Sequence, residues 1–205
     1  MKIPKVEFRW SFIYEEKFHA PFVKGIIFNR ESYRTYVERY IERVKQKWQP
    51  IGSRVLGFMA KISNLKWKAK TIPCYIVKIS TIGPISDPLT IPIQLKVGKK
   101  VFRLTTDRFI DILIHELIHN LFIQNETIDR YFDYLINKKY RKEGWNVAIH
   151  VPIHAIHQEI FLKFFDKKRL DREKKICENY PDYKRAWEIV EKEGSKEIIK
   201  ELKNF

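Results

Sequence analysis

Cysteine is nearly absent from this sequence, since only Cys74 and Cys177 occur among its 205 residues. Two cysteines without CxxC spacing cannot form a disulfide framework, and we interpret both as small buried side chains. Long apolar runs are missing too. No stretch approaches the roughly 18 apolar residues that cross a membrane, and residues 1–18 lack the apolar run of a signal peptide. We therefore expect a cytoplasmic protein that does not enter a membrane.

Acidic residues are too few to balance the basic ones. The chain has 40 lysines and arginines against 25 aspartates and glutamates, for a formal net charge of +15. The basic residues are spread along the chain, with denser patches at 138–142 and 166–175. We interpret these patches as solvated helix surface. The alternatives are an acidic peptide or protein partner, or a nucleic acid, although no recognised nucleic-acid-binding motif supports the latter.

Internal repeats and low-complexity segments are also absent, and a hydrophobic content of 44% is ample for a core. Abundant Lys, Ile and Glu with only two methionines are typical of thermophilic archaeal or viral proteins. We predict one compact domain made of an N-terminal strand and helical segment, a catalytic core and a C-terminal helical extension, with boundaries at 1–70, 71–166 and 167–205.

Hydrophobic periodicity predicts the elements. Strands are expected over 5–14, 73–80 and 89–97. Helices are expected over 30–48, 51–65, 104–125, 128–142, 146–165, 168–179, 182–192 and 195–204. Thr105 or Thr106 would cap the third helix, and Pro88 and Pro92 place the last strand at a sheet edge. The predicted fold class is α+β, with a small mixed or antiparallel sheet before the helix 104–125 and a mostly helical C-terminal half.

Five of the six histidines fall in two clusters, and the first forms an HExxH motif. Residues i and i+4 of a helix lie on one face, with Cβ atoms about 5–6 Å apart, so His115 and His119 can bind one zinc ion. Glu116 is then placed to take a proton from water on that ion. Metzincins would continue with Gly and His where this chain has Phe122 and Asn125, which argues against that class.

A catalytic zinc usually takes three protein ligands, and the second cluster, within 146–165, is expected to supply the third. His150, His154 and His157 form one stripe on a continuous helix. Pro152 would kink this helix or begin it, and in the latter case His150 leaves the stripe. A packed role in the core is the alternative for each histidine. Carboxylates also remain candidates: Glu126, Asp129, Asp133 and Glu159.

Residues 153–158 (I-H-A-I-H-Q) resemble the glutamate-helix pattern of gluzincins, N-E-A-I-S-D, and compact archaeal minigluzincins are the nearest size class. The resemblance covers residues 72–166. It places His154 where that family has its metal-binding Glu, which makes His154 the first candidate and His150, His157 and Glu159 the alternatives. It also implies that a strand at the sheet edge holds a peptide substrate by backbone pairing.

The same resemblance predicts a departure from the family. A histidine third ligand would give a three-histidine zinc site, and Gln158 replaces the Asp that orients a histidine ligand in gluzincins. Glu159 or Asp111 would have to supply that carboxylate instead.

The expected function is therefore that of a zinc metallopeptidase with Glu116 as the general base. Its substrate would be a peptide or protein, and an acidic substrate would suit the positive net charge of the chain. The first alternative is a non-proteolytic zincin-like protein that binds a nucleic acid or a partner protein around a structural zinc. Retention of Glu116 argues against it. A lower alternative is another zinc amide hydrolase with Cys74 as third ligand. The remaining histidine, His19, is isolated, and we interpret it as structural.

Overall fold

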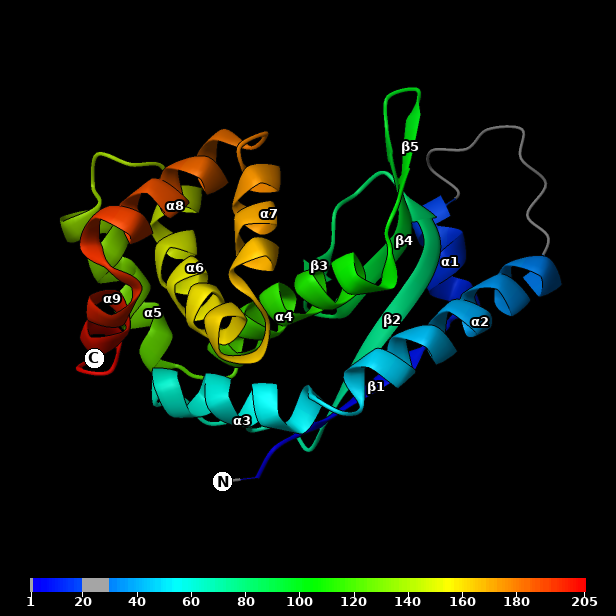
Figure 1. The fold of residues 1–205 in the computed structure, drawn as a ribbon, viewed down its shortest axis with the longest axis horizontal. Helices are drawn as coiled ribbons and strands as arrows, with labels where there is room; N and C mark the ends of the chain where they lie inside the picture. The colour runs from blue at the N-terminus through cyan, green and yellow to red at the C-terminus, as the bar shows by residue number, and fades with distance from the viewer. Residues whose placement is uncertain (1, 20–29) are drawn as a thin grey trace. The chain divides into compact units, whose positions relative to one another are not determined.

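The computed structural model describes residues 2–19 and 30–205 (Figure 1). His19 lies outside the described side chains. The described chain is a mixed α+β protein, 62% helical, with a five-stranded mixed sheet in the N-terminal half and a helical C-terminal half. The predicted fold class is confirmed.

The chain divides into two compact units. One consists of Met1–Ile3, Arg54–Lys68 and Leu121–Phe205, and the other of Pro4–Ser53 and Ala69–Asn120. The boundaries expected from the sequence stay a prediction.

The sheet belongs to the second unit. Its strands are β1 (Lys5–Arg9), β2 (Thr71–Ser80), β3 (Ile85–Ser86), β4 (Leu89–Val97) and β5 (Lys100–Arg103). β1 and β4 pair with β2 in parallel, whereas β3 and β5 pair antiparallel to β4, giving the order β1-β2-β4-β3 with β5 also on β4. Ile72, Cys74 and Ile76 alternate along β2 and are buried, as expected for a strand with one face on the core.

The first strand is shorter than predicted, because β1 ends at Arg9 and helix α1 (Phe12–His19) follows. The Ser11 hydroxyl accepts a hydrogen bond from the Tyr14 N–H and so stabilises the start of that helix. Glu15 in α1 is fully buried, and its carboxylate accepts bonds from the Lys78 N–H in β2 (3.0 and 2.9 Å). Burial raises the pKa of Glu15 to about 6, against the effect of these bonds.

The prediction that the 89–97 strand lies at a sheet edge is wrong. β4 has β2 on one side and both β3 and β5 on the other. Pro92 is tolerated because β3 pairs with Leu89 and Thr90 while β5 pairs from Gln94 onward, so this residue falls between the two antiparallel ladders.

Two long helices complete this unit, α2 (Arg30–Trp48) and α4 (Thr106–Ile123). The last three residues of α4 belong to the other unit. The Tyr40 hydroxyl on α2 bonds to the carbonyls of Leu104 and Thr105 at 3.2 Å each. The Thr105 hydroxyl accepts from the Arg108 N–H at 3.2 Å, which confirms the predicted cap. These bonds fix the start of the helix that carries the HExxH motif.

The other unit is helical. Its elements are α3 (Gly52–Ser63), which begins in the sheet-containing unit, α5 (Thr127–Tyr134), the π-helical turn η1 (Leu135–Lys139), α6 (Trp145–Phe164), α7 (Lys167–Cys177), α8 (Pro181–Glu193) and α9 (Ser195–Leu202). All but one match the predicted helices within a few residues, and the helix expected over 128–142 is divided into α5 and η1. Across the described ranges, no helix combines the length and the apolar character that crossing a membrane requires.

Candidate metal centre

The two histidines of the HExxH motif lie on one face of α4, as their spacing predicts. Their Nε2 atoms are 3.2 Å apart, and their ring planes are inclined by 66°. A tetrahedral zinc ion with Zn–N bonds of about 2.0–2.1 Å separates its ligand nitrogens by roughly 3.3–3.4 Å. The spacing of His115 and His119 therefore fits two ligands of one such ion.

Glu116 lies between these ligands in sequence and is 8% exposed. The Ser86 hydroxyl donates to Glu116 Oε2 at 2.7 Å, and the Asn120 amide donates to the Ser86 carbonyl at 3.0 Å. Strand β3 is thereby attached to α4 at two points one helical turn apart. Burial raises the pKa of Glu116 to about 7, and the hydrogen bond from Ser86 opposes this shift.

His150 lies in the first half of α6, which is continuous from Trp145 through Pro152. The helix does not begin at the proline, so His150 stays in the stripe with His154 and His157. Its Nδ1 atom is 2.7 Å from the Asn146 carbonyl oxygen, which only an Nδ1–H can satisfy. This tautomer leaves Nε2 with a lone pair for a metal. Burial lowers the pKa of His150, which favours the neutral imidazole that a metal requires.

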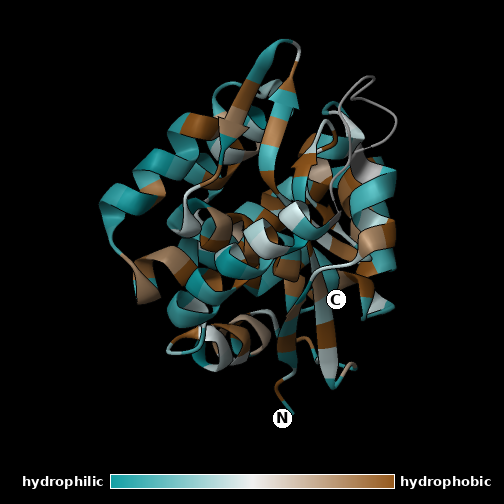
Figure 2. Cartoon of the chain, turned by 90° about the vertical axis from the view of Figure 1, so that its right-hand side faces the viewer, coloured by the Kyte–Doolittle hydropathy of each residue, from teal (hydrophilic) through white to brown (hydrophobic). Residues whose placement is uncertain are grey.

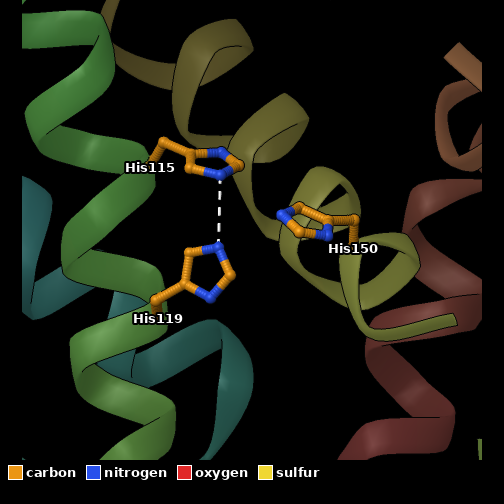
Figure 3. A group of neighbouring side chains, drawn as sticks. All are labelled: His115, His119 and His150. Carbon is orange, nitrogen blue, oxygen red and sulfur yellow. Dashed lines mark hydrogen bonds between the residues drawn. The ribbon is translucent and has the colours of Figure 1, made fainter. Parts of the chain in front are cut away.

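Figure 3 shows His115, His119 and His150 as a group of neighbouring side chains. One ligand nitrogen from each residue can be chosen so that all three lie within 4.8 Å of one another. This three-histidine group can hold a metal ion.

The other predicted third ligands have different surroundings. The imidazole of His154 stacks on the Trp187 indole of α8, with centroids 4.4 Å apart and planes inclined by 12°. His157 meets the Phe161 ring edge-on at 4.4 Å. The Glu159 carboxylate accepts from the Ser195 hydroxyl at 2.6 Å. Within the described residues none of the three belongs to the metal-binding group. Which of them ligates in the metal-bound protein stays a prediction, and the geometry favours His150.

Other candidates are also placed. Cys74 is fully buried in β2 and outside the group, and burial raises the pKa of its thiol far above the usual range. Glu126 is 91% exposed and pairs with Lys68, and the Asp133 carboxylate accepts from Asn137. The alternative of a cysteine-ligated amide hydrolase thus gains no support from the geometry.

Two contributors were missed by reasoning from the sequence. Ser86 lies between the predicted strands 73–80 and 89–97, and its contact with Glu116 depends on the pairing of β3 with β4, which no local sequence pattern predicts. Asn146 orients His150 through its backbone carbonyl, and because every residue has such a carbonyl, the sequence does not single this one out.

No family model, curated protein or solved structure matches this chain, so its site is described by its own residues alone.

Proposed function

We propose that this protein is a zinc-dependent peptidase in which His115, His119 and His150 hold the ion and Glu116 is the general base. One observation carries the proposal: three imidazoles able to share an ion, with a buried carboxylate adjacent in sequence to one of them. A purely structural site would need the ligands but not this carboxylate. The HExxH motif supports the roles of His115, Glu116 and His119, whereas the gluzincin resemblance favours His154 over His150 as the third ligand.

Zinc suits the donor set. Imidazole nitrogen is a common zinc ligand, and catalytic zinc sites typically use three protein ligands and keep a fourth position open. Copper, iron and nickel also accept imidazole, but hydrolysis needs no redox change, which favours the redox-inert ion. When bound, zinc supplies a Lewis acid that lowers the pKa of water toward 7.

The chain's own residues would handle the protons. The hydrogen bond from Ser86 holds Oε2 of Glu116 and leaves Oε1 to accept a proton from the attacking water. As the C–N bond of the peptide breaks, Glu116 returns that proton to the leaving amine nitrogen. Ser86 is a positioning residue in this scheme, because its hydroxyl fixes the carboxylate and does not touch the reacting atoms.

A peptide or protein is the proposed substrate, and an acidic one suits the net charge of +15. Strand β3 lies at one end of the sheet order, and its Ser86 contacts the general base. We therefore place an extended peptide along this edge, held by backbone pairing with little sequence discrimination.

The test is the Glu116→Gln variant, assayed for zinc content by mass spectrometry and for hydrolysis of a denatured, fluorescently labelled protein. We expect zinc to be retained and turnover to fall by about 10²–10⁴-fold, because only the proton acceptor is lost. Glu126→Gln is the matched control, since that carboxylate is exposed and pairs only with Lys68 among the described residues.

Equal turnover of the Glu116→Gln variant and the wild type would contradict the proposal. If the wild type binds stoichiometric zinc but hydrolyses no denatured protein, the alternative of a zincin-like binding protein is favoured.

A further inference from the structure

A groove in the sheet-containing unit lies between α2 and β5 and has a volume of about 630 Å³. Three arginines line it, Arg39 and Arg43 from α2 and Arg103 from β5, together with Tyr36. Glu31 is the acidic residue of the lining. All of these residues belong to one compact unit, so the groove is a feature of that unit alone.

The three guanidinium groups have no ion pair with any carboxylate of the described residues. The Tyr36 hydroxyl oxygen is buried and has no hydrogen-bond partner there either. Buried hydroxyl groups usually have a hydrogen-bond partner, and this hydroxyl can donate to an acceptor bound in the groove. The three arginines, without ion pairs in the described part of the chain, and the Tyr36 hydroxyl together form a site suited to bind an anion.

Aromatic rings hold the cations of this surface in place. The Lys78 ammonium is 3.8 Å from the centroid of the Tyr33 ring and 5.3 Å from that of Tyr36. The Arg103 guanidinium lies 5.5 Å from the Tyr36 ring. Because these contacts restrict the side chains before a ligand arrives, less conformational entropy is lost on binding.

The surface continues onto the hairpin formed by β4 and β5, since Arg103 belongs to both. This hairpin projects from the rest of its unit (Figure 1), and hydrophobic and hydrophilic bands alternate along it (Figure 2). Residues 95–103 (LKVGKKVFR) carry four basic and no acidic side chains. Three apolar side chains are also more than half exposed: Val97 (56%), Val101 (51%) and Phe102 (52%).

We propose that the groove and the hairpin together bind single-stranded nucleic acid. Arginine forks match phosphate oxygens in a bidentate way, and Tyr36 can donate to a further phosphate oxygen. Unstacked bases have faces that pack on exposed aromatic and apolar groups such as Phe102. An acidic peptide would satisfy the arginines but would leave the apolar side of the hairpin unused. This site does not depend on the proposed peptidase activity.

The test uses a fluorescein-labelled oligo-dT of about 12 nucleotides, with binding followed by fluorescence anisotropy between about 50 and 200 mM salt. We expect the triple variant R39A/R43A/R103A to bind at least about tenfold more weakly than the wild type. The slope of log K against log salt should become shallower by about 2, since each phosphate contact on a single strand contributes about 0.7.

The matched control is R130A/R141A/K168A, which removes the same three charges from exposed positions in the other unit. It should retain most of the affinity. A second variant, Phe102→Ser, keeps all charges and should weaken binding without changing the salt slope. Circular dichroism verifies that each variant is folded.

If the groove variant and its control lose equal affinity for the oligonucleotide, the proposal is overturned in favour of diffuse attraction by the net charge. Equal competition by a glutamate-rich peptide would overturn it in favour of a carboxylate-binding site. The Glu116→Gln variant should bind the oligonucleotide as the wild type does, so failure of the peptidase proposal and failure of this one are distinguishable.

Discussion

The tautomer of His150 is the residue-scale feature that most affects the proposed chemistry. Its Nδ1–H is committed to the Asn146 carbonyl at 2.7 Å, so the ring is oriented before any ion binds. By contrast, the His154 ring lies flat on Trp187, 4.4 Å away, and the two form a packed aromatic pair. The same residue type, one helical turn apart, thus has two different surroundings.

A pair of matched variants tests this difference. His150→Phe and His154→Phe each keep an aromatic ring but remove the ring nitrogens. We expect His150→Phe to weaken zinc binding by at least about a hundredfold, and His154→Phe to bind zinc as the wild type does. Competition with a fluorescent zinc chelator measures both affinities. The reverse pattern would restore the assignment of His154 that the gluzincin resemblance favours.

Residue identity revealed one half of the site and not the other. HExxH spacing on a helix brings His115 and His119 together by local geometry, and their Nε2 atoms are indeed 3.2 Å apart. The second cluster has three histidines on one helical stripe, and periodicity cannot rank them, because the ranking depends on what packs against each. Trp187, which stacks on His154, is more than 30 residues away in sequence.

At the scale of elements, the connection between helices α2 and α3 requires a glycine at the first position of α3. Gly52 begins α3 after a short turn that follows α2, and an added Cβ there would lie 2.5 Å from Nε1 of the buried Trp48. Gly57, inside the same helix, would place its Cβ 3.6 Å from the Ile3 side chain, an ordinary contact. The two glycines are therefore present for different reasons.

Alanine at these two positions should have opposite effects on the free energy of unfolding. Gly52→Ala is expected to destabilise the protein by about 1–3 kcal/mol, because the indole or the backbone must move. Gly57→Ala is expected to stabilise it by up to about 1 kcal/mol through helix propensity. Urea denaturation followed by circular dichroism measures both. A stabilising Gly52→Ala would show that Trp48 relocates at no cost.

Elements with strong periodicity were predicted well, and those fixed by pairing were not. Helix α2 has its predicted bounds, since an amphipathic pattern is a local signal. Helix α6 lies within one residue of its predicted bounds, although it is buried on most sides and has no side-chain cap. β1 was predicted too long because its alternation continues into α1, where Glu15 anchors a helix to β2 instead. The order of strands around β4 depends on long-range hydrogen bonds that no segment encodes by itself.

At the scale of the whole molecule, a zinc ion would link residues that are distant in sequence. His119 and His150 lie on different helices, and an unfolded chain has no preformed site at which they meet. Binding energy therefore adds to folding energy.

Zinc removal should accordingly lower the apparent stability of the whole chain. At a free zinc concentration of about a thousand times Kd, we expect a gain of about 4 kcal/mol in the free energy of unfolding over the chelator-treated protein. Differential scanning calorimetry with and without EDTA measures the shift, and H115A/H119A is the control that should not respond. An unchanged melting temperature of the wild type on chelation would contradict a resident zinc.

The sequence by itself determined the α+β class, most of the helices and the pair of α4 histidines with Glu116 beside them, because each depends on periodicity or spacing within one segment. Only the tertiary structure decided that His150 can form a metal-binding group with this pair, that the Ser86 hydroxyl bonds to Glu116 and that three arginines share a groove with Tyr36. In each of these cases the partners come from separate segments, and their meeting depends on packing and strand pairing across the fold.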